Sequence, residues 1–228
     1  LENLQEIGAF KVRGAANKIL SLPEGSRKAG VSTFSTGNHG AAVAYISSKL
    51  GIPAIVCMSR HVPKVKLKNI ARWGAKILQN WDSQDDAGVY CYEMEREQGI
   101  TVIPPFDDKE IICGQATMAL EIVEDLPKVD TVLVPLSGGG LISGVTLGMK
   151  MTLPDVKIVG ISQERAAVMI ESLKVGHPIE MPEEPTLADS LLGGIGLDNR
   201  YTFEITRDYV DEVAQVSEEQ IADGIAYI

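Results

Sequence analysis

The sequence predicts an α/β fold built on parallel β-sheet, and two observations carry this prediction. Short apolar runs alternate with longer segments of helical pattern along the chain, which is typical of βαβ units whose sheet is covered by helices on both faces. Of the 228 residues, 45% are hydrophobic and 23% are charged, so the chain has the apolar material for a sizeable core and disorder is not expected. The length suits one large domain or two small ones.

The strands are expected where the apolar runs are short: Val31–Phe34, Ala54–Met58, Lys76–Leu78, Thr101–Ile103, Thr131–Pro135 and Lys157–Ile161. A helix is expected after each strand in turn: Gly40–Leu50, Pro63–Trp73, Asp85–Gln98, Ile111–Glu124, Leu141–Met151 and Ala166–Lys174. The Pro- and Glu-rich stretch Pro178–Pro185 indicates a surface loop. Ser217 and Gln220 form a capping-box pattern that starts a last helix, Glu218–Ile228.

Charge and composition exclude several classes of protein. The net charge of −10 and the pI near 4.8 argue against nucleic-acid binding, which needs clustered Lys and Arg. No apolar run approaches the roughly 20 residues of a membrane helix. We expect reduced thiols in a cytoplasmic protein at Cys57, Cys91 and Cys113. We expect no metal site, because metal-ligand spacing is missing around His39, His61 and His177.

Three turns could carry chemistry, since ligands of such folds bind where strands lead into helices. The strongest is Ser137-Gly138-Gly139-Gly140-Leu141, between an expected strand and helix. Consecutive glycines let the backbone approach a ligand closely, and a helix N-terminus attracts anions, so this turn predicts a phosphate cup. The alternative is a tight turn that needs positive φ, for which one glycine would be enough.

The second turn is Ser35-Thr36-Gly37-Asn38-His39-Gly40. Its hydroxyls, amide and backbone donors at a helix start suit a carboxylate or another small anion. Plain helix capping by Ser, Thr or Asn explains the same residues equally well.

The third turn is Gly8–Ala16, in which Lys11 follows Phe10 among small and apolar residues. A lysine in an apolar pocket has a lowered pKa and can act as a nucleophile that forms a Schiff base. Composition alone favours a solvated lysine, because lysine is almost never fully buried and Arg13 lies nearby.

Taken together, the three turns resemble the fold type II family of pyridoxal 5′-phosphate (PLP) enzymes, with its threonine/serine dehydratases and serine racemases as the nearest branch. The resemblance covers Leu1–Ile228 in the family order, and it adds the motifs Glu2–Gln5, Pro104–Asp108 and Gly114–Thr117. Several matches in the right order are far more specific than any one of them. The resemblance therefore reverses the interpretation of Lys11.

The resemblance implies a role for each motif residue. Lys11 would hold PLP through an imine and then remove the substrate α-proton, Phe10 would pack beside the cofactor ring, and Asn38 would donate to the ring 3′-oxygen. The substrate carboxylate would be surrounded by Ser35, Thr36, Gly37, Asn38 and His39. The cofactor phosphate would be bound by Ser137, Gly138, Gly139, Gly140 and Leu141.

The activity that the resemblance implies is a dehydratase, or ammonia-lyase, that eliminates water and ammonia from a β-hydroxy amino acid to give a 2-oxo acid. The alternatives are an amino-acid (serine) racemase and a non-catalytic PLP-binding regulatory homologue. The partner is a small amino acid, and a homodimer or homotetramer is expected. Family members are longer at both ends, so the residue that faces the pyridine nitrogen is expected beyond Ile228.

Departures from the family pattern narrow these expectations. Ser137 replaces the first of four glycines in the phosphate loop and adds a hydroxyl donor, and Thr36 stands where racemases place a catalytic serine, which puts racemisation in doubt. Ser162 and Val168 occupy the positions of the acidic metal ligands of relatives, so no metal is expected. The segment Ala188–Arg200 looks more like the dehydratases associated with hydroxyectoine breakdown, so the substrate could be derived from hydroxyectoine.

The architecture implied by the resemblance is that of the tryptophan synthase β-like fold, with two parallel-sheet α/β domains and the active site in the cleft between them. A smaller domain, residues 30–106, would carry the Asn38 loop. A larger PLP-binding domain would combine residues 1–29 with residues 107–228 and would hold both Lys11 and the phosphate loop.

Overall fold

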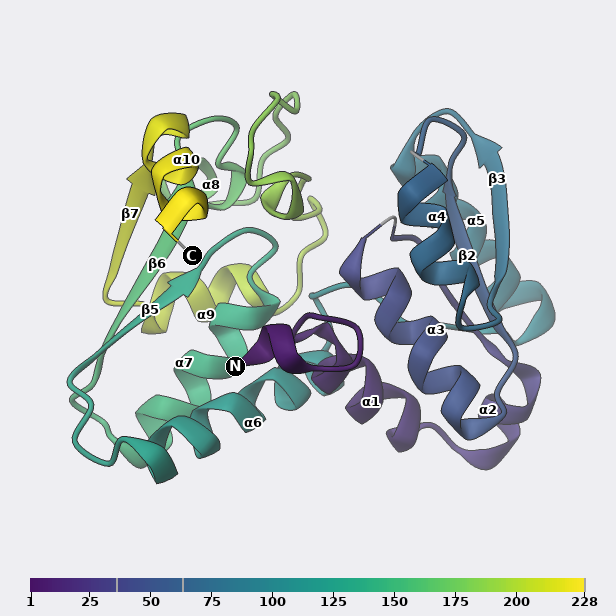
Figure 1. Ribbon diagram of the computed structural model, residues 1–228, viewed down its shortest axis with the longest axis horizontal. Helices are drawn as coiled ribbons and strands as arrows, with labels where there is room; N and C mark the ends of the chain where they lie inside the picture. Colours follow the sequence, from purple (N-terminus) through teal and green to yellow (C-terminus); the bar gives the residue numbers. More distant parts are fainter. Residues whose placement is uncertain (36, 63, 228) are drawn as a thin grey trace. The chain divides into compact units, whose positions relative to one another are not determined.

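The computed structural model describes residues 1–35, 37–62 and 64–227. Contacts within the chain divide it into two compact units, Leu1–Pro105 and Phe106–Ile228. Each unit contains its own sheet, and every strand pair in both sheets is parallel. The predicted parallel α/β fold is therefore confirmed (Figure 1).

The boundary between the units falls after Pro105, next to the predicted boundary at residue 106. Residues 1–29 make their contacts within the first unit, chiefly through α1 (Lys11–Ser21), which packs on α3 (Asn38–Leu50). Grouping residues 1–29 with residues 107–228 concerns how the two units fit together, and it stays a prediction.

The first unit carries a four-stranded sheet in the order β3-β2-β1-β4. Its strands are β1 (Val31–Thr33), β2 (Ala54–Ser59), β3 (Lys76–Trp81) and β4 (Thr101–Val102). Its helical segments are η1 (Glu2–Leu4), α1, α2 (Glu24–Ala29), α3, α4 (Lys64–Ala71) and α5 (Gln84–Gln98). Both α3 and α5 end at a glycine in the left-handed region, Gly51 and Gly99, which have φ of +66° and +70°.

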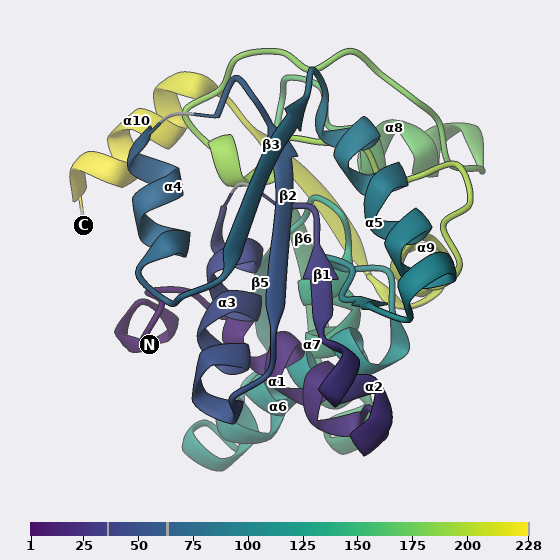
Figure 2. The same ribbon diagram turned by 90° about the vertical axis from the view of Figure 1, so that its right-hand side faces the viewer.

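Side chains of β2 alternate between two cores, one on each face of this sheet. Val56 and Met58 pack with α3 and α4, whereas Cys57 packs with Cys91 of α5. Figure 2 shows α3 and α4 on one side of the strands and α5 on the other. Cover on both faces explains why the strands read as short continuous apolar runs in the sequence.

The second unit carries a three-stranded sheet in the order β5-β6-β7. Its strands are β5 (Thr131–Pro135), β6 (Lys157–Gln163) and β7 (Glu212–Val216). Its helical segments are α6 (Lys109–Asp125), α7 (Gly140–Thr152), α8 (Val168–Val175), η2 (Asp189–Leu191), α9 (Thr202–Tyr209) and α10 (Glu218–Tyr227). Helices α6 and α7 pack at very close range, because a Cβ on Gly144 would lie 2.5 Å from the Ile112 carbonyl oxygen.

The structure also differs from the sequence prediction. Residues Gly8–Ala16 are not one turn, because the turn ends at Phe10 and Lys11 begins α1. Helices α2 and α9 and strand β7 were not predicted. Pro63 and Ile228, at the ends of two predicted helices, lie outside the described residues. Residues 178–185 contain neither helix nor strand, in agreement with the predicted loop.

Candidate functional site

Lys11 is the first residue of α1, and its side chain is partly buried. The Nζ atom donates a hydrogen bond of 2.7 Å to the carbonyl oxygen of Pro105 and lies 5.4 Å from the centre of the Phe10 ring. Arg13, two residues along the helix, forms a two-contact ion pair in which Nε and Nη2 lie 2.9 and 2.7 Å from the carboxylate oxygens of Glu2. The lysine amine is therefore held by one carbonyl group and one aromatic face.

Burial lowers the pKa of the Lys11 amine from 10.5 to about 8. The cause is desolvation, since removing the amine from water penalises its charged form. With this pKa, about a tenth of the amine is uncharged at pH 7, and the uncharged form is the one that attacks a carbonyl carbon. This result contradicts the solvated lysine that composition alone favours.

The second predicted turn leads from β1 into α3. Gly37 is the N-cap of α3, and the structure shows no side-chain capping bond there. Helix capping therefore does not explain the polar residues of this turn that the structure describes. Ser35 Oγ instead accepts a long hydrogen bond of 3.4 Å from the Gly37 N–H, and the Asn38 side chain is exposed in the first turn. Thr36 lies outside the described residues. A helix N-terminus without a side-chain cap suits a carboxylate.

His39 differs from what the resemblance implies for it. Its ring is buried, with 2% of the residue exposed, and its Nε2 lies 2.9 Å from the Ile103 carbonyl oxygen. Burial, together with the nearby charge of Lys11, lowers its pKa to about 3, against the raising effect of the Ile103 bond. The neutral ring must donate from Nε2, so Nδ1 is an acceptor, and no described group donates to it. The ring is therefore unsuited to bind a carboxylate directly.

The glycine turn joins β5 to α7 in the second unit. Gly139 is the N-cap of α7, with φ of +85° and no side-chain capping bond. The first hydrogen bond of the helix runs from the Ser143 N–H to the Gly139 carbonyl oxygen, at 2.9 Å. The N–H groups of Gly140 and Leu141 therefore have no acceptor within the helix. These donors, at the positive end of a 13-residue helix, fit a phosphate.

All three glycines of this turn also have a packing reason to be glycine. A Cβ on Gly138 would lie 2.5 Å from the Phe106 ring, and a Cβ on Gly140 would lie 2.8 Å from the Phe106 Cβ. A Cβ on Gly139 would lie 2.7 Å from the Thr202 Cβ. In the sequence, one glycine would be enough for a tight turn, and we took the other two as evidence for a bound phosphate. The structure shows that Phe106 also requires two of them, so their number alone is weaker evidence for phosphate than we expected.

Ser137 does not direct its hydroxyl at the glycines. Its Oγ donates a hydrogen bond of 2.9 Å to the carbonyl oxygen of Leu191, the last residue of η2. The hydroxyl has a single proton, so in this arrangement Ser137 cannot also donate to a phosphate. The side-chain donor that the resemblance implies for the phosphate is thus engaged elsewhere.

Within each unit the structure brings the predicted residues together. In the first unit Phe10, Lys11 and His39 converge on the segment 103–105, because the carbonyl oxygens of Ile103 and Pro105 bind His39 and Lys11. In the second unit the glycine turn packs on Phe106 and Thr202. The motif Pro104–Asp108 contributes to the family resemblance in the sequence, but its role could not be predicted there.

Asp107, in the same motif, supports the glycine turn through α9. Its carboxylate accepts hydrogen bonds from the N–H groups of Arg200, Tyr201 and Thr202, at 2.7, 2.9 and 2.9 Å. These bonds cap the start of α9 and place Thr202 against Gly139. Phe106 and Asp107 are therefore structural partners of the candidate phosphate site.

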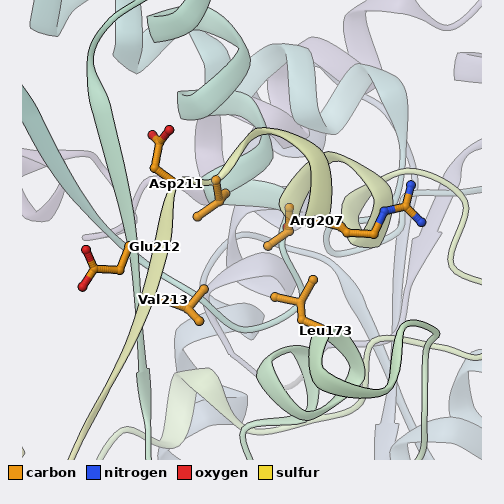
Figure 3. Close-up of a pocket in the computed structure, with 7 residues that line it drawn as sticks. Leu173, Arg207, Asp211, Glu212 and Val213 are labelled. Carbon is orange, nitrogen blue, oxygen red and sulfur yellow. The ribbon is translucent and has the colours of Figure 1, made fainter.

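A surface hollow of about 240 Å³ lies elsewhere in the second unit, between α8, α9 and β7, and it contains none of the predicted site residues. Figure 3 shows the charged ends of Arg207, Asp211 and Glu212 pointing away from the apolar Leu173 and Val213. Each charged group is paired with a neighbour, for example Asp211 with Lys150 at 2.8 Å. Since these charged groups are engaged with their neighbours, we do not assign the hollow a ligand.

Membrane-spanning helices and clusters of metal ligands are the next two features of the described residues. None of the described helices is long and apolar enough to cross a membrane. Among residues 1–35, 37–62 and 64–227, no three His, Cys, Asp or Glu side chains are grouped as metal ligands would be. Val168 is buried, and the Ser162 hydroxyl donates to Gln163 Oε1 at 3.1 Å. The expected absence of a metal stays a prediction.

The structure thus defines an α/β protein with a buried lysine amine and, in each unit, a helix N-terminus without a side-chain cap. Comparison with known proteins then identifies the family. The family model described as "Pyridoxal-phosphate dependent enzyme" matches residues 1–228. The chain belongs to this family, whose cofactor is PLP.

Individual relatives agree with this assignment. The chain is 46% identical to a putative threonine dehydratase of Sinorhizobium fredii, covering 100% of this chain and 68% of the relative. It is 41% identical to an L-threonine ammonia-lyase of Thermotoga maritima, covering 100% of this chain and 56% of the relative. The structure of maize serine racemase superposes with a TM-score of 0.93 at 37% identity, covering 99% of this chain and 68% of that one. The fold is thus that of the fold type II PLP enzymes, and the chain spans 56–68% of these relatives' lengths.

Proposed function

We propose that the protein is a PLP-dependent ammonia-lyase, or dehydratase, that converts a β-hydroxy amino acid into a 2-oxo acid and ammonia. The observation that carries this proposal is the buried Lys11 amine, bound to the Pro105 carbonyl group at the position that the family motif assigns to the cofactor lysine. Relatives named threonine dehydratase and L-threonine ammonia-lyase support the reaction type. Threonine, serine and amino acids derived from hydroxyectoine are the candidate substrates.

The residues present fit the cofactor, because α7 offers uncapped N–H groups and Lys11 offers a buried amine. When bound, PLP supplies the electron sink that stabilises a carbanion at the substrate α-carbon. Lys11 would hold the cofactor aldehyde and, once released, would take the α-proton at Nζ. Phe10 would pack beside the cofactor ring, and the N–H groups of Gly138–Leu141 would hold the phosphate.

The turn before α3 would hold the substrate. We propose that Ser35, Gly37 and the uncapped N–H groups at the start of α3 surround its carboxylate, with Thr36 beside them. Asn38 is exposed in the first turn of α3 and would donate to the ring 3′-oxygen. The His39 ring would support this turn through its hydrogen bond to the Ile103 carbonyl oxygen, and it would not contact the carboxylate directly.

The proposal extends to the whole protein. We propose a homodimer or homotetramer in the cytoplasm, two domains with boundaries near residues 30 and 106, and no metal ligand at Ser162 or Val168. These features follow from the family resemblance and from the side chains at those two positions.

The test is a comparison of the wild type with Lys11→Ala and with Lys28→Ala, which changes an exposed lysine paired with Glu24. Borohydride reduction should fix PLP on the peptide that contains Lys11 in the wild type and in Lys28→Ala only. A panel of threonine, serine and hydroxyectoine-derived amino acids should release ammonia with the same two proteins. Turnover by Lys11→Ala would contradict the mechanism, and a protein that retains PLP but releases no ammonia from any substrate would be a non-catalytic homologue.

Serine racemase is a second candidate, because maize serine racemase superposes so closely on this chain. Racemisation needs a second proton carrier on the opposite face of the substrate, and Thr36 stands at that position of the motif. A threonine methyl group restricts the rotamers of its hydroxyl, so we expect elimination to dominate. Chiral analysis after incubation with L-serine decides between the two, since accumulation of D-serine would favour the racemase.

A further inference from the structure

Ser137 connects the glycine turn to a long irregular segment of the second unit. Residues 187–199, which we name the 187–199 loop, contain only η2 as regular structure. The Leu191 carbonyl oxygen accepts the Ser137 hydroxyl at 2.9 Å, and the Gln163 side-chain amide lies 3.5 Å away from it. Ser137 therefore supplies the shorter of the two polar contacts to this carbonyl group.

The rest of the loop is anchored at its two ends. At the first end, Glu218 of α10 accepts a hydrogen bond of 2.9 Å from the Leu187 N–H and another from the Thr186 hydroxyl. At the second end, the Asn199 side chain donates to the Thr202 hydroxyl oxygen at 2.8 Å and accepts from the Phe203 N–H at 2.9 Å. Ser137, together with the longer contact from Gln163, holds Leu191 between these anchors.

Two glycines at positive φ follow Leu191, one on each side of the buried Ile195. Gly193 and Gly196 have φ of +116° and +80°. A Cβ on Gly193 would meet nothing within 4 Å, so this glycine is not required by packing. Glycine at positive φ without a packing reason supplies conformational freedom. The path of the loop between Leu191 and the buried Ile195 thus depends in part on what holds Leu191.

We propose that Ser137 is a positioning residue that ties the 187–199 loop to the phosphate-binding turn, and that it does not itself bind the phosphate. The single hydroxyl proton can be donated to Leu191 or to a phosphate, and it is donated to Leu191. An anion that fixes the turn at Gly138–Gly140 then also fixes Ser137 and, through it, the loop. A glycine at this position would have no hydroxyl and could not form this connection.

The proposal rests on the proposed function only for the identity of the anion, the phosphate of PLP. The experiment uses the full chain, with and without PLP, as wild type, Ser137→Ala, Ser137→Gly and Thr152→Ala. Thr152 provides a matched control, because its hydroxyl donates to the Gly148 carbonyl oxygen at 3.1 Å at the far end of the same helix. Hydrogen exchange of peptides from residues 187–199 is measured by mass spectrometry, and PLP affinity is measured by absorbance titration and by phosphorus NMR of the bound phosphate.

The Ser137 variants should exchange about fivefold faster in the 187–199 loop, the factor expected for one neutral hydrogen bond of about 1 kcal/mol. Addition of PLP should slow this exchange in the wild type and in Thr152→Ala but much less in Ser137→Ala and Ser137→Gly. PLP affinity should differ from that of the wild type by less than threefold in all three variants. Exchange of peptides from β5 and α7 reports whether a variant is folded. If Ser137→Ala does not fold, the comparison is made with Ser137→Gly.

Two results would overturn the proposal. One is a tenfold loss of PLP affinity in Ser137→Ala with unchanged loop exchange, which would assign the hydroxyl to the phosphate. The other is unchanged loop exchange together with unchanged affinity. Failure of the wild type to bind PLP at all would instead count against the proposed function, because the exchange difference between the proteins without PLP can still be measured.

Discussion

Lys11 and His39 are buried bases, and burial lowers the pKa of both. For His39 the result is a ring that stays neutral at any physiological pH, fixed by the Ile103 carbonyl group. For Lys11 the pKa of about 8 lies close to neutral pH, so the amine can both lose and accept a proton under these conditions. The same desolvation therefore keeps the His39 ring neutral and brings the pKa of the Lys11 amine closer to neutral pH.

A reactive buried lysine should cost the protein stability, and Lys11→Met tests this. Between pH 8 and 10.5 the unfolded chain, with an ordinary lysine, binds more protons than the folded chain, so the free energy of unfolding rises with pH in this window. Below pH 8 the full penalty is present. Lys11→Met should therefore stabilise the cofactor-free protein at pH 7 by on the order of 1–3 kcal/mol, measured by urea unfolding.

The control for this prediction is pH itself. The lost bond to the Pro105 carbonyl group reduces the gain at every pH, whereas the desolvation penalty disappears once the unfolded lysine is also neutral. The advantage of Lys11→Met should thus shrink as the pH rises towards 10.5. An advantage that does not change with pH would mean that the Lys11 amine is not desolvated.

At the scale of elements, the turn between β5 and α7 combines two requirements at the same residues. Its glycines leave the N–H groups of α7 open to an anion, and they also allow Phe106 and Thr202 to pack against the turn. Asp107 fixes Thr202 by capping α9. A substitution in this turn should therefore affect stability even in the absence of a ligand.

Gly138→Ala measures the packing requirement. The added Cβ would lie 2.5 Å from the Phe106 ring, and overpacking of this kind typically costs about 1–3 kcal/mol. The matched control is Gly224→Ala in α10, where nothing lies within 4 Å and alanine should stabilise the helix by up to about 1 kcal/mol. The double variant Gly138→Ala/Phe106→Leu should recover part of the loss in urea unfolding, and equal losses in single and double variants would show that Phe106 is not the obstacle.

Elements with strong local patterns could be predicted from the sequence. The apolar, β-branched run of β5 was predicted with its observed bounds, and Asp108 and Ser83 cap α6 and α5 from adjacent positions. Helix α9 was missed because Asp107, which caps it, lies 95 residues before Thr202 in the sequence. Strand β7 was missed because three of its five residues are exposed, so it lacks a buried apolar run.

The candidate site shows the same limit. Its motifs pointed to Lys11 and to the glycine turn, but the groups that give these residues their properties are distant in sequence. The Pro105 carbonyl group that binds Lys11 is 94 residues away, and the Leu191 carbonyl group that engages Ser137 is 54 residues away. Backbone carbonyl groups leave no trace in residue type, so only the fold could reveal these contacts.

At the scale of the whole molecule, an acidic chain is proposed to bind an anionic cofactor. The net charge of −10 repels phosphate at long range, although salt screens this repulsion over about 8–10 Å. Phosphate binding must therefore depend on local groups, chiefly the N–H groups at the start of α7. This separation of local attraction from global repulsion gives a test that does not need turnover.

Inorganic phosphate at low millimolar concentration should raise the unfolding midpoint of the cofactor-free protein, whereas chloride at equal ionic strength should produce only the smaller gain from screening the net charge. The stabilisation should follow the linkage relation, reaching about 2.7 kcal/mol at one hundred times the dissociation constant. Lys11→Ala should retain it, because backbone N–H groups hold the phosphate. Gly139→Ala should lose it, because a Cβ there would force the turn away from Thr202 and from its φ of +85°. Equal midpoints in phosphate and chloride for the wild type would mean that the glycine turn binds no anion, and the assignment of the cofactor phosphate to this turn would then be wrong.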